Sequence, residues 1–230
     1  MHDPRNQSPF NAPPPVVVAL AALIIGLEVM FQAAEAGFVG GRQAVGWRLN
    51  AIRDWAVDGS VVAWMIETGQ APLRQLARFV TYPLIHGSFV HAAFVVVFVL
   101  ALGNVCAPVF PSWRLPILFW ASAVAGALVY VMLFPSSGPL FGGYPGAYGL
   151  IGVFTLLTRK GLTRVDPDRA FLLIGFLLAI QPIFGLAGGL GFAWFPDWIA
   201  DIAGFAAGYG LAQLMFPGGL QGLIGRMRQR

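Results

Sequence analysis

Charged side chains are scarce in this chain. Only 10% of its 230 residues are Asp, Glu, Lys or Arg, against about 25% in an ordinary soluble domain. Apolar residues make up 57%, and the mean hydropathy is +0.73. These values exclude an ordinary water-soluble protein. The formal net charge of +4 comes from Arg and Lys concentrated in particular loops, which indicates membrane topology and not binding of nucleic acid.

Cysteine and histidine are also rare. Cys106 is the single cysteine, which excludes an intrachain disulfide and a cluster of cysteine metal ligands. Outside His2 near the start, only His86 and His91 supply imidazoles. These two lack further ligands nearby in the sequence, so we expect neither a metal nor another cofactor.

Long apolar runs are abundant and recur along the chain. A transmembrane helix needs roughly 20 apolar residues, and lipid admits only helices or closed barrels. The runs do not alternate as barrel strands do, so we predict an all-α membrane protein with six transmembrane helices. The runs cover Val16 to Phe31, Leu84 to Leu102, Leu115 to Phe134, Tyr144 to Leu157, Phe171 to Leu186 and Trp194 to Phe216.

The runs divide the chain into a polar N-terminal tail at 1–13, a six-helix membrane domain at 14–216 and a basic C-terminal tail at 217–230. The first run has a signal-peptide alternative, because Ala34-Glu35-Ala36 looks like a cleavage site. The run is longer than the roughly 7–15 apolar residues of a signal peptide, which favours a transmembrane helix.

The segment 37–78 mixes tryptophan with charged residues at amphipathic spacings. Trp47, Trp55 and Trp64 suit the headgroup level of a bilayer, where the ring is buried and its N–H stays hydrated. We predict an interfacial loop with short helices. A small extramembrane subdomain packed on itself is the alternative.

Basic residues in short loops predict the orientation, because such loops face the cytoplasm. The five arginines of the 37–78 loop break the rule, but long loops carry little weight. We expect a bacterial inner membrane with the C-terminus in the cytoplasm. The basic positions are Arg159, Lys160, Arg164 and Arg169, with Arg226, Arg228 and Arg230 in the tail.

Three motifs in order resemble the rhomboid family of intramembrane serine proteases. The segment from Arg78 to His91 is similar to the start of rhomboid helix two, Gly142 to Gly152 to helix four, and Ala200 to Gly208 to helix six. The resemblance spans residues from about 14 to 216. It implies a six-helix rhomboid bundle.

The same resemblance implies that the catalytic chemistry has been lost. The family uses a serine on helix four, a histidine base on helix six, and a His and Asn on helix two that support the oxyanion. The matching positions hold Tyr144, Asp201, His91 and Val95. Because a serine needs a base and the oxyanion needs donors, we expect no catalytic residues.

The motif residues then have structural or binding roles. A buried carboxylate in a membrane needs a partner, so we predict a hydrogen bond between Tyr144 and Asp201. Glycines at helical spacing permit close helix packing. The candidate binding or structural residues are His86, His91, Tyr144, Tyr148, Gly149, Asp201, Gly204 and Gly208.

The resemblance leaves two functions open. The first is a pseudoprotease that binds transmembrane segments of other membrane proteins in the bilayer without cutting them, as the inactive iRhoms and derlins are thought to do. The alternative is an active intramembrane serine endopeptidase. A small-solute permease is a third class, but the chain shows no inverted repeat and few intramembrane charges, at Glu28, Glu35 and Asp201.

Overall fold

The computed structural model describes residues 12–187 and 191–216. Within them, six helices have 16 residues or more: α1, α6, α7, α8, α9 and α10. Shorter helices and two paired strands fill the segment between α1 and α6. The elements in order are α1 Pro15–Glu35, α2 Gly41–Ala44, α3 Trp47–Trp55, β1 Val57–Asp58, α4 Gly59–Thr68, α5 Leu73–Thr81, η2 Tyr82–Leu84, α6 Phe89–Cys106, α7 Arg114–Leu133, β2 Pro139–Leu140, α8 Tyr144–Arg159, η3 Pro167–Arg169, α9 Leu172–Ala187 and α10 Phe195–Met215.

The six long helices correspond to the six predicted apolar runs. The largest difference at a helix start is in α6, which begins at Phe89 and not at Leu84. Pro83 lies in the 3₁₀ turn Tyr82–Leu84, and the Ser88 hydroxyl then caps α6 by accepting a hydrogen bond from the backbone N–H of His91 at 3.3 Å. His86 therefore lies in the loop before the helix.

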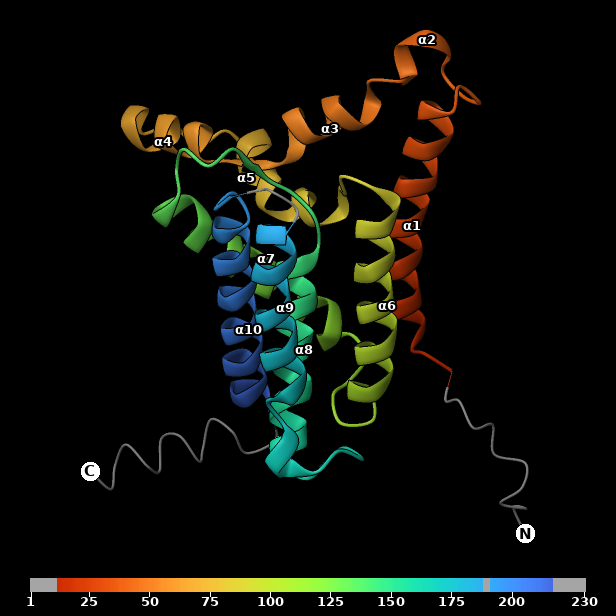
Figure 1. Cartoon of the computed structure of the whole chain (residues 1–230), viewed down its shortest axis with the longest axis vertical. Helices are drawn as coiled ribbons and strands as arrows, with labels where there is room; N and C mark the ends of the chain where they lie inside the picture. The colour runs from red at the N-terminus through yellow and green to blue at the C-terminus, as the bar shows by residue number, and fades with distance from the viewer. Residues whose placement is uncertain (1–11, 188–190, 217–230) are drawn as a thin grey trace.

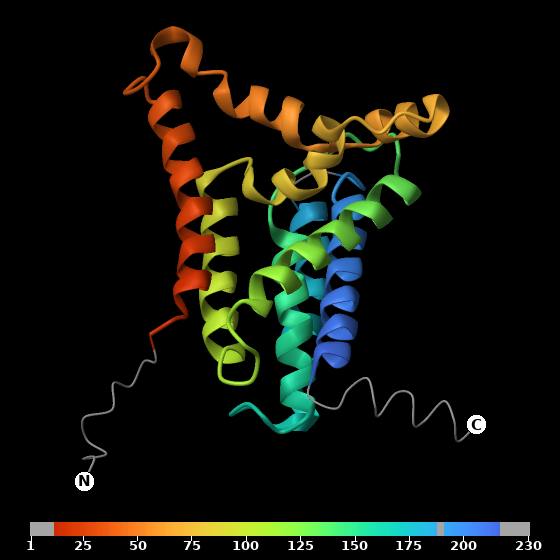
Figure 2. The ribbon, with the colours of Figure 1, turned by 180° about the vertical axis from the view of Figure 1, so that it is seen from behind.

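Helix α8 is the centre of the bundle. It packs on α6, α7 and α10, and nearly all of its residues are buried. Figures 1 and 2 show the other long helices arranged around it. Because neighbouring helices shield α8 from lipid, α8 can be as short as 16 residues.

Close contact between α8 and α10 depends on glycine. A Cβ on Gly204 would overlap the backbone of Pro145, and one on Gly208 would overlap the backbone of Gly149. On the other helix, a Cβ on Gly152 would meet the backbone of Phe205 and Tyr209. Small residues let helix backbones approach in this way inside membranes. The predicted packing role of the glycines is consistent with these contacts.

The segment between α1 and α6 forms short helices, as the sequence predicts for the loop at 37–78. Helices α2 to α5 lie at one end of the bundle, and α3 runs across the helix axes (Figure 1). Asp58 caps α4 by accepting from the backbone N–H of Ser60 at 2.8 Å. The strand pair, which the sequence did not predict, joins Val57 to Leu140 and Asp58 to Pro139, so this segment is tied to the loop before α8.

Four segments of the described residues are long and apolar enough to cross a membrane: α1, α6, α7 and Pro167–Ala187, which contains η3 and α9. The chain is therefore an integral membrane protein. Helix α8 is shorter, with 16 residues, and α10 carries Asp197 and Asp201. Most of the predicted N-terminal tail and all of the tail at 217–230 lie outside the described residues.

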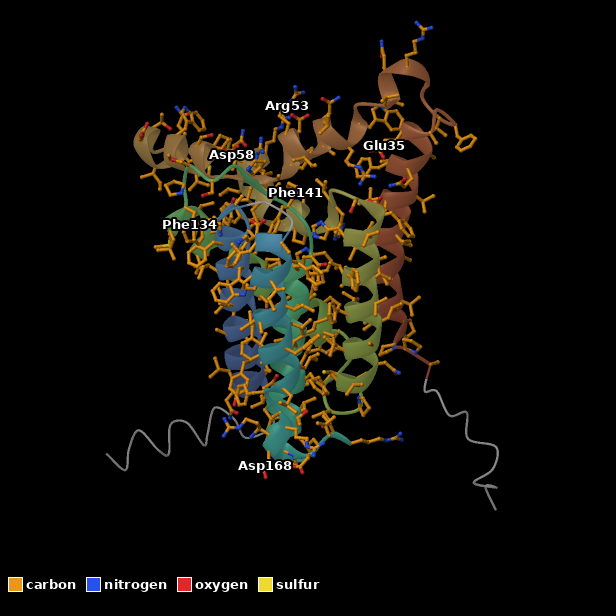
Figure 3. The ribbon with its side chains drawn as sticks, in the orientation of Figure 1. Glu35, Arg53, Asp58, Phe134, Phe141 and Asp168 are labelled. Carbon is orange, nitrogen blue, oxygen red and sulfur yellow. The ribbon has the colours of Figure 1, made fainter. Side chains whose placement is uncertain are left out.

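The start of α1 and the ends of α8 and α10 lie at one end of the bundle, opposite to α2–α5 (Figure 2). Figure 3 places Asp168 at the first end, and Glu35 and Arg53 at the other. The basic residues Arg159 and Lys160 lie at the C-terminal end of α8, at the same end of the bundle as Asp168 (Figures 2 and 3).

The glycine contact gives a test. We expect Gly208→Ala to lower the free energy of unfolding by about 1–3 kcal/mol, because the new methyl group forces the backbones of α8 and α10 apart. Gly210 on the same helix has open space around its Cβ position, so Gly210→Ala is the matched control and should leave stability unchanged or raise it slightly. Thermal unfolding in detergent measures both. Equal stability of the two variants would contradict the contact.

Candidate functional site

The site is built on the turn that leads into α8. The backbone N–H of Gly142 donates to the carbonyl of Tyr82 at 3.0 Å, and the N–H of Gly143 donates to His86 Nε2 at 3.2 Å. The Tyr82 hydroxyl is buried and donates to the carbonyl of Ala123 on α7 at 2.7 Å. The turn is thus held against the segment before α6 and, through Tyr82, against α7.

Gly142 has to be glycine for two reasons. Its φ of +98° is in the region that disfavours a side chain, and a Cβ there would overlap the imidazole of His91. The ring of His91 therefore lies directly against the turn. Phe141, labelled in Figure 3, precedes it, with its ring centroid 6.4 Å from that of His91.

Aromatic rings fill the place where α6 meets the start of α8. The rings of His91 and Tyr144 are stacked, with centroids 4.7 Å apart and planes inclined by 22°. His86 lies edge-on to His91 at 4.9 Å, and Tyr148 lies edge-on to Tyr144 at 6.4 Å. The structure therefore brings together four of the residues that the sequence singled out.

The position that matches the family asparagine is apolar. Val95 is fully buried, and its side chain lies where a Cβ of Gly143 would stand. A valine has no hydrogen atom to donate to an oxyanion. This part of the site packs against the turn into α8 and offers no side-chain donor.

Asp201 does not pair with Tyr144, so the predicted hydrogen bond between them is wrong. Asp201 is buried on α10, and its Oδ2 accepts a hydrogen bond from Gln181 Nε2 of α9 at 2.8 Å. The amide of Gln181 is a donor that needs no ionisation, which makes it a sufficient partner for a buried carboxyl group. Sequence reasoning missed Gln181 because it searched only the two helices named by the family motifs.

The described residues contain no hydrogen bond between a serine hydroxyl and a histidine ring. The Ser88 hydroxyl caps α6, and the buried Ser122 hydroxyl on α7 lies beside Gly149 without a hydrogen-bond partner in the structure. His86 uses Nε2 to accept from a backbone N–H. A serine nucleophile requires a base within hydrogen-bonding reach, and none of these contacts supplies one.

No group of three or more His, Cys, Asp or Glu side chains that could hold a metal ion occurs in the part of the chain that the structure describes. His86 and His91 face one another edge-on within an aromatic cluster. Their direct neighbours include the rings of Phe141 and Tyr144 and the backbone of Gly143.

Arg48 on α3 connects the interfacial segment to the site. Its guanidinium donates to both carboxylate oxygens of Glu28, at 2.8 and 2.9 Å, and to both of Glu35, at 2.6 and 3.4 Å. It also donates to the carbonyl oxygen of His86 at 2.7 Å. These five hydrogen bonds match the five N–H donors of a guanidinium. Arg48 therefore holds the loop before α6 in place through the carbonyl of His86. The imidazole of the same residue accepts the hydrogen bond from Gly143.

Arg48 and Glu28 are buried and paired with one another, whereas the Glu35 side chain is 38% exposed. The side chains of Arg48 and Glu28 are 6% and 1% exposed, and the Arg48 guanidinium lies 5.3 Å from the ring centre of Phe31. Hydrogen bonding to Glu28, with a further contribution from Glu35, raises the pKa of Arg48 above its ordinary value. From the sequence, Glu28 and Glu35 were recognised only as two of the few charged residues within apolar segments. Their spacing of seven residues, which places them on one helix face, was the signal for a shared cation.

The fold and site define a class: a membrane helix bundle with a glycine-packed central pair and a segment of short helices between its first two long helices. The model of the Rhomboid domain family matches residues 73–218, more than half of the chain. The chain belongs to the rhomboid family. A comparison with curated proteins found no match.

The Arg48 network predicts a large effect of mutation. Arg48→Leu should lower the free energy of unfolding by about 3–5 kcal/mol, because it leaves the buried carboxylate of Glu28 without its cation. Arg53 lies on the same helix with a side chain 75% exposed, so Arg53→Leu is the control and should change stability by less than about 1 kcal/mol. Thermal unfolding in detergent compares them. Similar losses in both variants would argue against the network.

The partner of Asp201 gives a second prediction. Gln181→Leu should cost about 1–3 kcal/mol, because the buried carboxyl group loses its donor. Tyr144→Phe should change stability by less than about 0.5 kcal/mol, since removal of a hydroxyl with no hydrogen bond in the structure is a mild substitution. Should Tyr144→Phe prove the more damaging of the two in thermal unfolding, the assignment of Gln181 as the partner is wrong.

Proposed function

We propose that the chain is a six-span rhomboid pseudoprotease that binds transmembrane segments of other membrane proteins and does not cleave them. The observation that carries the proposal is the stacking of Tyr144 on His91 at the family's serine position. Val95 and Asp201 occupy the asparagine and histidine positions. A phenol with an unperturbed pKa of about 10, and with no histidine at the position of the family's base on α10, is poorly suited to peptide hydrolysis.

The loose attachment of α9 supports binding of a transmembrane partner. Only Ile174 and Gly185 of α9 are buried, and its outer surface carries large apolar side chains such as Phe176 and Phe184, which are 62% and 67% exposed. Among the described residues, two side-chain hydrogen bonds join it to α10. They are the bond from Gln181 to Asp201 and the bond from Trp198 Nε1 to the carbonyl of Leu178.

Small displacements of α9 would disturb few buried contacts, so a helix from a partner could pack beside it. In rhomboid proteases the corresponding helix borders the entry of the substrate, which the resemblance implies for this chain. We place the interfacial segment 37–78 at the membrane surface and the C-terminus in the cytoplasm of a bacterial inner membrane. These placements follow from the charge distribution and the position of α2–α5.

Binding without cleavage can be tested on purified protein in detergent. A photocrosslinking amino acid at Phe184 on α9 should capture an intact model transmembrane peptide, whereas the same group at Val29 on α1, also exposed to lipid, should capture much less. The wild-type chain should neither shorten the peptide nor react with a fluorophosphonate probe. An active rhomboid protease is the positive control for both readouts.

A cleavage product or probe labelling of the wild-type chain would establish the alternative, an active intramembrane serine endopeptidase. The triple variant Tyr144→Ser, Asp201→His and Val95→Asn distinguishes lost chemistry from a lost fold. Probe labelling of this variant alone would show that the bundle can still hold a dyad. Equal capture at Phe184 and Val29 would contradict binding beside α9.

A further inference from the structure

A second site lies away from the centre of the bundle, between α1, α3 and the segment from Thr81 to Ile85. A cavity of about 460 Å³ opens there, a size within the range of roughly 300–1,000 Å³ typical of small-molecule sites. It borders the Arg48 network, since Phe31 lines the cavity and also contacts the guanidinium of Arg48. It does not include the residues around Tyr144.

The cavity is lined mainly by apolar side chains, with a few polar side chains among them. Leu27, Met30 and Phe31 of α1 line the apolar wall, together with Leu84 and Ile85. Met30 is also 39% exposed on the outer surface of α1. The cavity therefore opens toward the lipid that surrounds α1. The polar residues that line the cavity are Asn50, Asp54 and Thr81.

The depth of the cavity matches the boundary between lipid tails and headgroups. Met30 lies five residues before Glu35, the last residue of α1, which is about 7.5 Å along a helix axis. Trp47 and Trp55 also line the cavity, and tryptophan is enriched at this level of a membrane. An occupant with an apolar chain and a polar head fits this environment.

Asp54 lines the cavity and has two arginines beside it. Asp54 lies 3.5 Å from Arg53 Nε and 3.8 Å from Arg74 Nη2, while Arg53 and Arg74 are 75% and 60% exposed. Such long, exposed pairs are weak, so the three charges remain available to a ligand. A carboxylate flanked by two guanidinium groups complements a zwitterion that carries one ammonium and one phosphate.

We propose that this cavity binds one phosphatidylethanolamine molecule, with an acyl chain against α1, its ammonium on Asp54 and its phosphate beside Arg53 and Arg74. A primary ammonium donates hydrogen bonds to a carboxylate, and such charge-assisted bonds are strong. The trimethylammonium of phosphatidylcholine has no N–H to donate. An anionic glycerol headgroup lacks the cation that Asp54 requires. The site is independent of the proposed binding of transmembrane segments.

Native mass spectrometry of the full-length, delipidated protein tests the proposal. The protein is incubated in detergent with equal amounts of phosphatidylethanolamine, phosphatidylcholine and phosphatidylglycerol of the same acyl chains. The wild type should retain phosphatidylethanolamine roughly tenfold more than either competitor, as one charge-assisted hydrogen bond allows. Asp54→Asn should remove this preference, because the neutral amide no longer attracts the ammonium.

Cavity filling provides the second arm. Ala51 of α3 lines the cavity, so Ala51→Phe should abolish the retained lipid, whereas Ile66→Phe on the exposed surface of α4 should retain it as the wild type does. If Ala51→Phe fails to fold, Met30→Trp fills the cavity from the opposite wall. Equal retention of phosphatidylethanolamine and phosphatidylcholine, preference for phosphatidylglycerol, or full retention by a folded cavity-filled variant would each overturn the proposal.

Discussion

The close approach of α8 and α10 is the constraint on which the rest of the bundle depends. A Cβ on Gly204 or Gly208 of α10 would overlap the backbone of α8, and a Cβ on Gly152 of α8 would overlap the backbone of α10, so a side chain at these positions would separate the two helices. Lipid tails are as apolar as leucine, so helices in a membrane gain little from the hydrophobic effect when they associate. Van der Waals contact between close backbones therefore has to supply much of the stability, and glycine makes that contact possible.

A second constraint couples the interfacial segment to this centre. Arg48 of α3 joins Glu28 and Glu35 of α1 and the carbonyl of His86, and the His86 imidazole then accepts from the N–H of Gly143. The loop before α6 is thus held from both sides. Such a buried charge network stabilises only if every member is satisfied, and here the five guanidinium N–H donors have acceptors. This explains how a helix outside the bundle fixes the entrance to α8.

Much of the fold could be predicted from the sequence, because its signals are local. Apolar runs identified the six long helices, and tryptophan with arginine identified the short helices between α1 and α6. The strand pair at Val57 and Leu140 could not be found, since two residues give no periodicity. In the site, the packing role of the motif glycines was predictable from their helical spacing, whereas the stacking of Tyr144 on His91 was not, because it joins residues far apart in the sequence. The partner of Asp201 was not, because Gln181 lies twenty residues away on a helix without a motif.

The motif glycines and the two polar residues Tyr144 and Asp201 make different demands on the fold. A Cβ on Gly208 would force two backbones apart, and a close-packed interior adapts poorly to such a change. The start of α8 instead accommodates a phenol ring, because Tyr144 can stack on His91 beside the turn at Gly142. Asp201 is likewise accommodated by one amide from Gln181. The packing of this rhomboid bundle is therefore compatible with a phenol ring at the start of α8 and a carboxyl group on α10.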